Sequence, residues 1–295
     1  MKTLKISLLT LALGIIVVSA TKVSLAETYN PEINPSEFTT NIDNKYFTLF
    51  SGLELEYSGE TDEGTETVEI SIDGKTRKIM GVTTLVYRDK VWLDGELVED
   101  TEDYLAQDAD GNVWYFGEEV DNYENGKLVD HDGSWIAGVD GAKPGIWMKG
   151  NPKVADTYKQ EFYAGEAEDE ATVLSLTETV KVPFGTFTNC LKTLDVNPLE
   201  EGTEEHKYYC PEAKAMVLEV GIENGERIEL VEKEVEDDGD DEGDDEGDED
   251  EDGDDEEGEG DDEDEEGDSA LRAQLDRIME RLLEILAIIK EGVFN

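Results

Sequence analysis

The residues whose types and spacing suit chemistry lie between residues 101 and 147, where aromatic side chains, carboxylates and glycines follow one another closely. This mixture can form a surface for a carbohydrate or another small ligand, and it can equally form the core of a β-hairpin. Trp135 and Trp147 lie in glycine-rich chain typical of loops, where an aromatic side chain need not fill a strand layer. We therefore predict that they bind a ligand together with Trp114 and Glu118, although alternation around Trp114 favours a core position for at least one aromatic pair.

Acid and base candidates are also present near these aromatic residues. A hydrolase acting on an extracellular polymer would need two carboxylates about 5–10 Å apart in a cleft beside Trp135 or Trp147. Its candidate residues are Glu118, Glu119, Asp108 and Asp140. Solvated carboxylates are common in a chain with 77 acidic and 24 basic residues, and the two histidines, His131 and His206, lie in different segments. No catalytic residue is therefore assigned, and the sequence favours a non-catalytic binding module, with this hydrolase and a carrier of apolar ligands as the alternatives.

Two stretches have the oxygen donors of a calcium loop. Residues 108–112 alternate suitable donors, but the same residues form a tight hairpin turn without a metal, and we favour the turn. The C-terminal tail satisfies the EF-hand spacing with Asp248, Asp250, Asp252 and Glu259. In a tract of only Asp, Glu and Gly this match arises by chance, and no helical pattern enters or leaves the loop. We expect no required cofactor, and either loose, multi-site binding of Ca2+ or Mg2+ by the tract or a solubilising spacer.

The two cysteines predict one part of the topology. Cys190 and Cys210 are equidistant from residue 200, which lies in the turn-like segment 197–203, so a hairpin centred there places them opposite each other. In an exported protein this arrangement favours a cross-strand disulfide over two free buried thiols. Closing a loop of about 20 residues would stabilise the fold by on the order of 3 kcal/mol.

The elements that must hold these residues have the pattern of short strands. Asp-Gly and Asn-Gly pairs recur between residues 73 and 225, and they supply the positive φ angles of tight hairpin turns. Between the pairs, apolar and polar residues alternate with period two, and no convincing helical period precedes Ser269. We therefore predict an all-β domain over residues 27–235, a single antiparallel meander of ten or more strands that is closed or half-closed like a barrel. The runs expected to form strands are 67–72, 84–87, 91–93, 112–116, 158–163, 172–182, 187–196, 206–210, 216–220 and 227–231.

The N-terminus predicts export. Lys2 and Lys5 precede the apolar run 6–18, which is too short to span a membrane but suits the apolar region of a signal peptide. A cleavage site of small residues follows, so we assign residues 1–26 to the signal peptide, with cleavage after residue 20 as the competing site and an uncleaved anchor as the alternative. We expect the mature chain in the periplasm or outside the cell, with no transmembrane segment.

The C-terminal part predicts a tether followed by an assembly helix. Residues 236–268 contain only Asp, Glu and Gly, which predicts a disordered linker that spans roughly 30 Å as a coil and about 100 Å when extended. Residues 269–292 follow with the apolar spacing of a coiled coil. The stripe consists of Leu271, Leu275, Ile278, Leu282, Ile285 and Ile289. We expect a homo-oligomer or a partner helix at this stripe, with packing against the β domain as the alternative, and a module spacing that responds to divalent cations.

The charge balance excludes nucleic acid as a partner. The chain has a formal net charge of −53, and the acidic excess already holds for residues 1–235, which contain 47 acidic and 20 basic residues. Such a body repels phosphate groups instead of attracting them.

Two motifs carry a resemblance to a known group of proteins. Residues 106–118 read Ala-Gln-Asp-Ala-Asp-Gly-Asn-Val-Trp-Tyr-Phe-Gly-Glu, and residues 133–146 read Gly-Ser-Trp-Ile-Ala-Gly-Val-Asp-Gly-Ala-Lys-Pro-Gly-Ile. With them the chain resembles a broad family of secreted bacterial β-rich proteins that largely lack an assigned activity, over about residues 46–231. The resemblance implies a secreted β-rich protein but no particular reaction, and it does not include the acidic tract or the C-terminal helix.

Overall fold

The computed structural model describes residues 29–200 and 202–235. These belong to the first of two units, Met1–Asp240, and the second unit, Asp241–Asn295, lies outside the described residues. The predicted signal peptide, acidic linker and C-terminal helix also lie outside them, and so do Asp248, Asp250, Asp252, Glu259 and the apolar stripe from Leu271 to Ile289. Within the described residues no helix is long and apolar enough to cross a membrane.

The described residues form strands joined by short connections, with one short 3-10 helix. In chain order the elements are η1 (Pro35–Glu37), β1 (Phe38–Thr39), β2 (Ile42–Asp43), β3 (Thr48–Leu49), β4 (Leu53–Thr61), β5 (Gly64–Ile72), β6 (Thr76–Ile79), β7 (Val82–Leu93), β8 (Glu96–Asp108), β9 (Val113–Glu124), β10 (Lys127–Asp130), β11 (Trp135–Ile136), β12 (Lys143–Met148), β13 (Thr157–Lys159), β14 (Glu161–Phe162), β15 (Glu170–Val182), β16 (Gly185–Val196), β17 (Glu205–Cys210), β18 (Ala215–Gly221) and β19 (Arg227–Val235).

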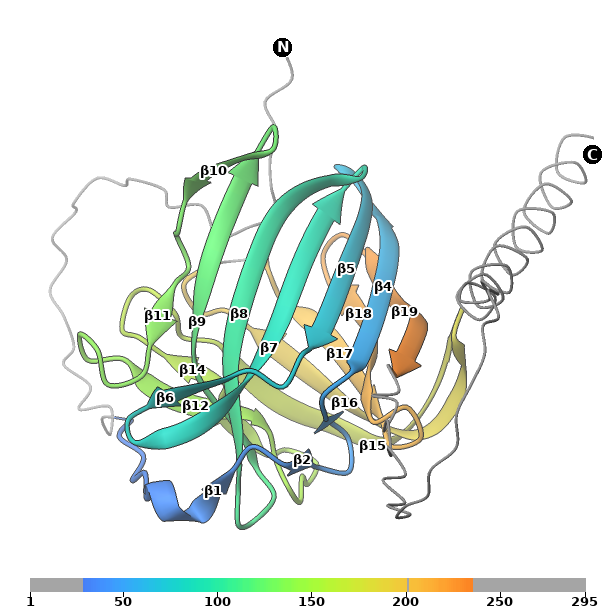
Figure 1. The fold of residues 1–295 in the computed structure, drawn as a ribbon. Coiled ribbons are helices and arrows are strands. Elements are labelled where there is room, and N and C mark those ends of the chain that lie inside the picture. Colours follow the sequence, from blue (N-terminus) through green and yellow to red (C-terminus); the bar gives the residue numbers. More distant parts are fainter. Residues whose placement is uncertain (1–28, 201, 236–295) are drawn as a thin grey trace, which may run out of the picture. The chain divides into compact units, whose positions relative to one another are not determined.

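Nearly all strands belong to one antiparallel sheet that curves into a nearly closed barrel. On one side β4, β5, β7, β8 and β9 pair in this order, and β9 pairs onward with β12, which pairs with β14. On the other side β13, β15, β16, β17, β18 and β19 follow one another, and Figure 1 shows β15 and β16 crossing behind β7 and β8. Because β19 pairs with β4, the two sides are joined. The prediction of an all-β, antiparallel, closed or half-closed fold is confirmed.

The turn residues act as their types predict. In the β7–β8 hairpin, Asp94 and Gly95 have φ angles of 51° and 80°, and in the β9–β10 hairpin Asn125 and Gly126 have 52° and 70°. Positive φ at both central residues is the geometry that matches the twist of the flanking strands. These two Asp-Gly and Asn-Gly pairs therefore fix where long strands reverse direction.

Aromatic packing closes one end of the barrel. Phe47, in the turn between β2 and β3, is buried, and its ring centroid lies 5.8 Å from that of Trp147 and 6.0 Å from that of Tyr87. It also lies 6.4 Å from Tyr209. These three rings come from β12, β7 and β17, so Phe47 fills the interior between opposite walls. β2, β3 and their turn, drawn at the lower edge of Figure 1, thus plug this end.

The predicted disulfide is present. Leu191 of β16 lies opposite Tyr209 of β17, and the adjacent Cys190 and Cys210 are bonded, with Cα atoms 4.2 Å apart. Both cysteines are fully buried. The hairpin centred near residue 200 is therefore confirmed, and the disulfide crosses it between neighbouring strands.

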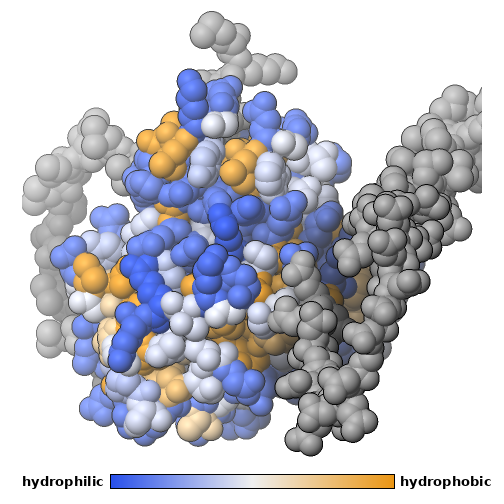
Figure 2. Space-filling view, in the orientation of Figure 1, coloured by the Kyte–Doolittle hydropathy of each residue, from blue (hydrophilic) through white to orange (hydrophobic). Residues whose placement is uncertain are grey.

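The outer surface of the barrel is largely hydrophilic. Figure 2 shows mostly hydrophilic residues over the visible face, with smaller apolar patches between them. On this side of the sheet Arg88 of β7 forms an ion pair of 2.6 Å with Asp100 of β8. The alternation expected from the sequence thus separates a polar exterior from the interior of the barrel, which we name the lumen.

Candidate functional site

Carboxylates face the lumen along one wall of the barrel. Residues opposite each other in neighbouring strands face the same side of a sheet. Asp89 lies opposite Ile70, and Asp103 lies opposite Tyr87, so both acids face inward with these buried side chains. The same register places two further acids inward. From the open end toward the plug, the four are Glu66, Glu99, Asp89 and Asp103, which we name the carboxylate ladder.

The ladder has a regular spacing. Glu66 is level with Leu93 of β7, Glu99 is level with Val91, and Asp103 is level with Tyr87, while Asp89 belongs to β7 itself. The four carboxylates therefore occupy successive inward positions, two residues apart along this strand. Each step corresponds to about 7 Å along the barrel wall.

Burial and repulsion raise the pKa values of the ladder. Burial, followed by the charge of Glu219, raises the pKa of Glu66 to about 7. Burial also raises the pKa of Asp103 to about 7, although a hydrogen bond from the Tyr115 hydroxyl opposes this. The pKa of Asp89 is raised well above its usual range by burial and then by Asp103 and Glu99. Below these raised pKa values the ladder carboxyls hold protons, which a bound cation would displace.

Asp89 lies at the centre of this electrostatic conflict. Its Oδ1 atom is buried and has no hydrogen-bond partner among the described residues. Besides Asp103 and Glu99, the charges of Glu219 and Glu66 also act on it. A buried acceptor without a donor is destabilising, so a ligand N–H at this position would satisfy an existing deficit.

The opposite wall holds an ammonium group. The Nζ atom of Lys207 lies 3.4 Å from Glu219, 3.5 Å from Glu205 and 4.0 Å from Asp195. Burial lowers the pKa of Lys207, but these carboxylates raise it by more, so it lies well above the usual value. Lys207 is thus a permanent cation that the lumen surrounds with acids.

Two buried polar side chains beside Lys207 are incompletely satisfied. Thr193 is 1 % exposed and Asp195 is 6 % exposed, and they face inward opposite Lys207 and Glu205. Within the described part of the chain, neither the Thr193 hydroxyl nor either carboxylate oxygen of Asp195 makes a hydrogen bond of good distance and angle, although Thr193 and Gln160 lie near enough to Asp195 to lower its pKa. These oxygens are acceptors directed at the same lumen as the ladder, so both walls offer sites for donors.

The two walls meet around a cavity at the open end. The cavity measures about 360 Å³, and Glu66, Glu205 and Glu219 line it together with the aliphatic side chains of Val91 and Leu93. Carboxylates beside apolar side chains suit an organic cation with an apolar stem. The cavity lies between the β4–β5 and β18–β19 turns, opposite the end that Phe47 fills.

Tyrosine rings lie deeper in the lumen. Tyr57 and Tyr87 are buried, and Tyr57 donates a hydrogen bond of 3.0 Å to the carbonyl oxygen of Met216. Burial, followed by the charge of Asp89, raises the pKa of Tyr57, so this hydroxyl stays neutral. Neutral aromatic rings beside carboxylates favour cations.

A β-bulge at Gly117 decides where Glu118 points. Asp103 lies opposite Glu118, but Leu105 lies opposite Tyr115, so β9 contains one extra residue at this point. Gly117 has a φ of 125°, a backbone conformation that residues with a side chain rarely adopt. As a result Tyr115 and Glu118 both face inward, which simple alternation along β9 would not allow.

The bulge brings Glu118 to Trp135 and to an acid that the sequence interpretation did not include. The indole Nε1 of Trp135 donates to Glu118 Oε1 and to Glu161 Oε2, each at 3.0 Å, so the two oxygens lie within about 6 Å of each other. Burial raises the pKa of Glu161 to about 8, and burial followed by Asp103 raises that of Glu118 well above its usual range. Glu118 and Trp135 also line a cleft of about 240 Å³.

The other predicted tryptophans have structural contacts. Trp114 is half-buried, and its Nε1 donates a hydrogen bond of 2.7 Å to Asp108 Oδ2. The ring centroid of Trp147 lies 5.0 Å from that of Tyr115, and the buried Nε1 of Trp147 has no hydrogen-bond partner among the residues described. Trp147 therefore lies in the aromatic base of the lumen, whereas Trp114 lies on the opposite side of the sheet.

Two of the three remaining acid and base candidates, Glu119 and Asp140, line the same cleft as Glu118 and Trp135, and Asp108 does not. Glu119 lies on the outer side of β9, where it forms an ion pair of 2.7 Å with Arg77. Asp140 is exposed and lines the same cleft as Glu118. Asp108 accepts hydrogen bonds from the backbone N–H groups of Asp110 and Asn112, each at 2.9 Å. The turn interpretation of residues 108–112 is thus supported, although four residues instead of two connect β8 and β9.

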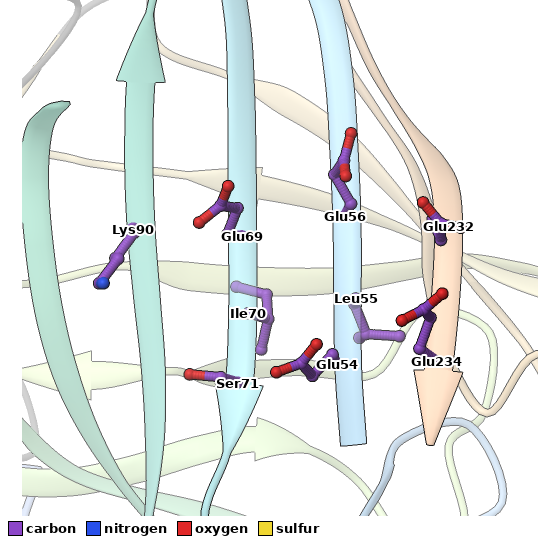
Figure 3. Close-up of a pocket in the computed structure, with 9 residues that line it drawn as sticks. All are labelled: Glu54, Leu55, Glu56, Glu69, Ile70, Ser71, Lys90, Glu232 and Glu234. Carbon is purple, nitrogen blue, oxygen red and sulfur yellow. The ribbon is translucent and has the colours of Figure 1, made fainter. Parts of the chain in front are cut away.

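An acidic hollow of about 380 Å³ lies on the outside of β4, β5, β7 and β19 (Figure 3). Glu56 is opposite both Glu69 and Glu232, and Glu54 is opposite Glu234. Like charges in opposite positions are mutually destabilising. Because an acidic cluster alone does not define a ligand, we assign no site to this surface.

Comparisons with known proteins add no identity. No protein-family model, curated protein or solved structure matches the chain. The resemblance to secreted β-rich proteins therefore stays a prediction. Within the described residues, no group of three or more His, Cys, Asp or Glu side chains could hold a metal ion.

Proposed function

We propose that this chain is an exported, non-catalytic binding module whose lumen binds a small organic cation. The observation that carries the proposal is Asp89, a buried carboxylate with an unsatisfied oxygen and four acids acting on it. An ammonium group would satisfy that oxygen and neutralise the repulsion around it. The mixed lining of the cavity favours a cation with an apolar stem over a purely apolar ligand.

Calorimetric titration of the full mature chain with hexylammonium tests this function. Binding at one site per chain is expected, with no binding of the neutral analogue hexanol. Asp89→Asn should reduce the affinity by about tenfold, because the variant keeps the shape of the side chain but removes its charge.

Glu69→Gln is the matched control, since it removes one acid from the exposed outer side of the adjacent strand. The affinity of this variant for hexylammonium should equal that of the unmodified chain. Equal binding of hexanol, or equal losses in both variants, would contradict a cation site in the lumen.

We further propose that the C-terminal stripe assembles the modules and that the acidic tract spaces them. Both segments lie outside the described residues, so this part rests on the apolar spacing and the charge of the sequence. Sedimentation and small-angle scattering with and without Ca2+ test it. A monomer of unchanged dimensions in both conditions would contradict it.

A second candidate function has one specific observation in its favour. Glu118 and Glu161 converge on the Trp135 indole beside a cleft, which is the arrangement that a hydrolase with paired carboxylates needs. Incubation with a panel of polysaccharides, followed by measurement of new reducing ends, tests it. Formation of reducing ends that is abolished in Glu118→Gln and in Glu161→Gln would support this function. Formation that is unchanged in both variants would exclude these residues as the catalytic acids.

A further inference from the structure

The arrangement of acids in the lumen indicates which organic cation binds, an inference that rests on the proposed function. We infer that the ligand is a linear polyamine, an unbranched aliphatic chain with several ammonium groups, which lies along the carboxylate ladder.

The ladder matches a cation whose charges are spread along a line. Its carboxylates occupy four successive inward levels, from Glu66 at the cavity to Asp103 near the aromatic base, with steps of about 7 Å along the strand direction. They alternate between β5, β7 and β8, which lie about 4.8 Å apart, so the row of charges is a zigzag along the wall. Spacers of three or four methylenes place neighbouring ammonium groups at a separation comparable to one step. A cation with a single charge would leave most of these acids unpaired.

A metal ion would need the opposite arrangement. Ca2+ takes six to eight oxygen ligands at about 2.3–2.6 Å, so its ligands must converge on one point. In the described ranges no three His, Cys, Asp or Glu side chains converge in this way. The acids of the lumen are instead distributed over both walls, as an extended polycation requires.

Lys207 shows that the lumen accommodates an ammonium group on a methylene chain. Its Nζ lies 3.4–4.0 Å from three carboxylates, which belong to β17 itself and to the neighbouring strands β16 and β18. A polyamine presents the same chemical group on the same kind of stem. Lys207 therefore serves as an internal example of the ligand chemistry, on the wall opposite the ladder.

A second, independent observation points to a ligand with several N–H donors. The Thr193 hydroxyl and the Asp195 carboxylate are more than nine-tenths buried and face the lumen. Neither makes a hydrogen bond of good distance and angle among the described residues, and the polar groups nearest Asp195 are Thr193, Gln160 and, at 4.0 Å, Lys207. Asp89 offers a further buried acceptor on the other wall. Each ammonium of a polyamine carries two or three donors, so one ligand chain can satisfy acceptors on both walls.

The test compares butylamine, 1,4-diaminobutane, spermidine and Mg2+ by calorimetric titration of the full mature chain at about pH 8 and 0.15 M salt, which weakens binding to the exposed acidic tract. Spermidine should bind at one lumen site per chain, about tenfold tighter than the diamine, and the diamine should bind tighter than butylamine. The double variant Asp89→Asn with Asp103→Asn should lower the affinity for spermidine by at least about tenfold, and Glu66→Gln alone should lower it by a smaller factor.

The matched control removes two acids from the tract instead, as Asp250→Asn with Asp252→Asn, and should change spermidine affinity by less than about twofold. Butylamine or Mg2+ binding as tightly as spermidine, with the same dependence on Asp89, would overturn the polyamine inference but leave a cation site in the lumen. Amine binding that responds only to the tract variant would overturn both this inference and the proposed function. Thermal denaturation of each variant shows that it is folded.

Discussion

Asp89 is a residue at which stability and binding oppose each other. The residue as a whole is half-buried, but its Oδ1 atom is buried and lacks a hydrogen-bond partner among the described residues, and burial and nearby acids raise the pKa of the carboxyl group. Asp89→Asn removes the charge while keeping the shape. We expect the free energy of unfolding at about pH 8 to rise by about 1–3 kcal/mol, because the folded variant no longer has to bury a carboxyl group whose pKa burial raises.

Urea denaturation at about pH 8 measures this change, and Glu69→Gln provides the control. Glu69 is exposed on the outer side of the adjacent strand, so its variant should stay within about 0.5 kcal/mol of the unmodified chain. A loss of stability in Asp89→Asn would mean that the carboxylate makes a favourable interaction in the empty lumen, contrary to the electrostatic argument.

Residue types predicted some of the site and missed its main part. Glu118 and Trp135 were singled out together, and they do share a hydrogen bond. The partner acid Glu161 was missed because it lies far away in sequence and only the β12–β14 pairing brings it near. The ladder was missed for another reason. In a chain with 77 acidic residues, we expect a carboxylate in a strand to face the solvent. Only the strand register shows whether it faces the interior instead.

At the scale of the element, Gly117 is the residue on which β9 depends. A Cβ atom built there would lie 2.3 Å from the carbonyl oxygen of Trp135, and residues with a side chain rarely adopt its φ of 125°. We expect Gly117→Ala to lower the free energy of unfolding by at least about 1–3 kcal/mol, because both the backbone strain and the clash with β11 act together.

Gly126→Ala separates the two effects in the same denaturation experiment. Gly126 also has a positive φ, of 70°, but a Cβ atom there would meet nothing within 4 Å. Its variant should therefore lose only about 1 kcal/mol from backbone strain. Equal losses at the two glycines would show that the close approach of β11 to β9 contributes nothing.

The outer acidic hollow is an element-scale feature with a testable penalty. Glu54 of β4 lies opposite Glu234 of β19, so two like charges face each other across the strands that close the barrel. Glu54→Lys turns this into an opposite-charge pair and should raise the free energy of unfolding by about 0.2–1 kcal/mol.

Denaturation at low and high salt measures the effect of Glu54→Lys, because screening should remove most of the gain. Glu96→Lys makes the same charge change at an exposed position opposite Leu93, and it should gain less. A gain that is equal in both variants would assign it to the net charge of the protein and not to the Glu54–Glu234 pair.

The strand pattern was predictable where turn chemistry and alternation agree. The β7–β8 and β16–β17 hairpins follow from the Asp94-Gly95 turn and from the symmetric cysteines. β8 itself was not among the expected strands, because six of its thirteen residues are acidic and acids are depleted in strands. Its inward acids Glu99 and Asp103 have no place in a purely apolar core. A strand with inward-facing acids therefore lacks the alternation of apolar and polar residues by which strands are predicted from a sequence.

At the scale of the whole molecule, the barrel is apolar and aromatic at its plugged end and acidic at its open end. Raised pKa values occur at both ends: about 7 for Glu66 and for Glu205 at the open end, chiefly through burial, and about 8 for Glu161 beside Trp135. Carboxylates with lowered pKa values occur on the surface instead. Glu119 is one, because Arg77 donates a hydrogen bond to it.

These shifts fix the sign of the pH dependence. A carboxyl whose pKa is raised on folding holds more protons in the folded than in the unfolded state at pH values between its ordinary pKa and its raised pKa. Stability therefore falls as pH rises through that interval, here from about pH 4 to about pH 8. Surface acids such as Glu119 act oppositely, but only below about pH 4.

We therefore expect the unfolding temperature of the empty protein to fall from about pH 5 to about pH 8, and a saturating cation to stabilise it more at pH 8 than at pH 5. The second effect follows because binding requires ionised lumen carboxylates and releases their protons. Differential scanning calorimetry measures both, at about 0.5 M salt so that repulsion among exposed acids is screened. An unfolding temperature that rises over this interval, or a cation effect independent of pH, would mean that the lumen acids are ionised throughout. Asp89 would then not be held in the strained state from which cation binding is argued.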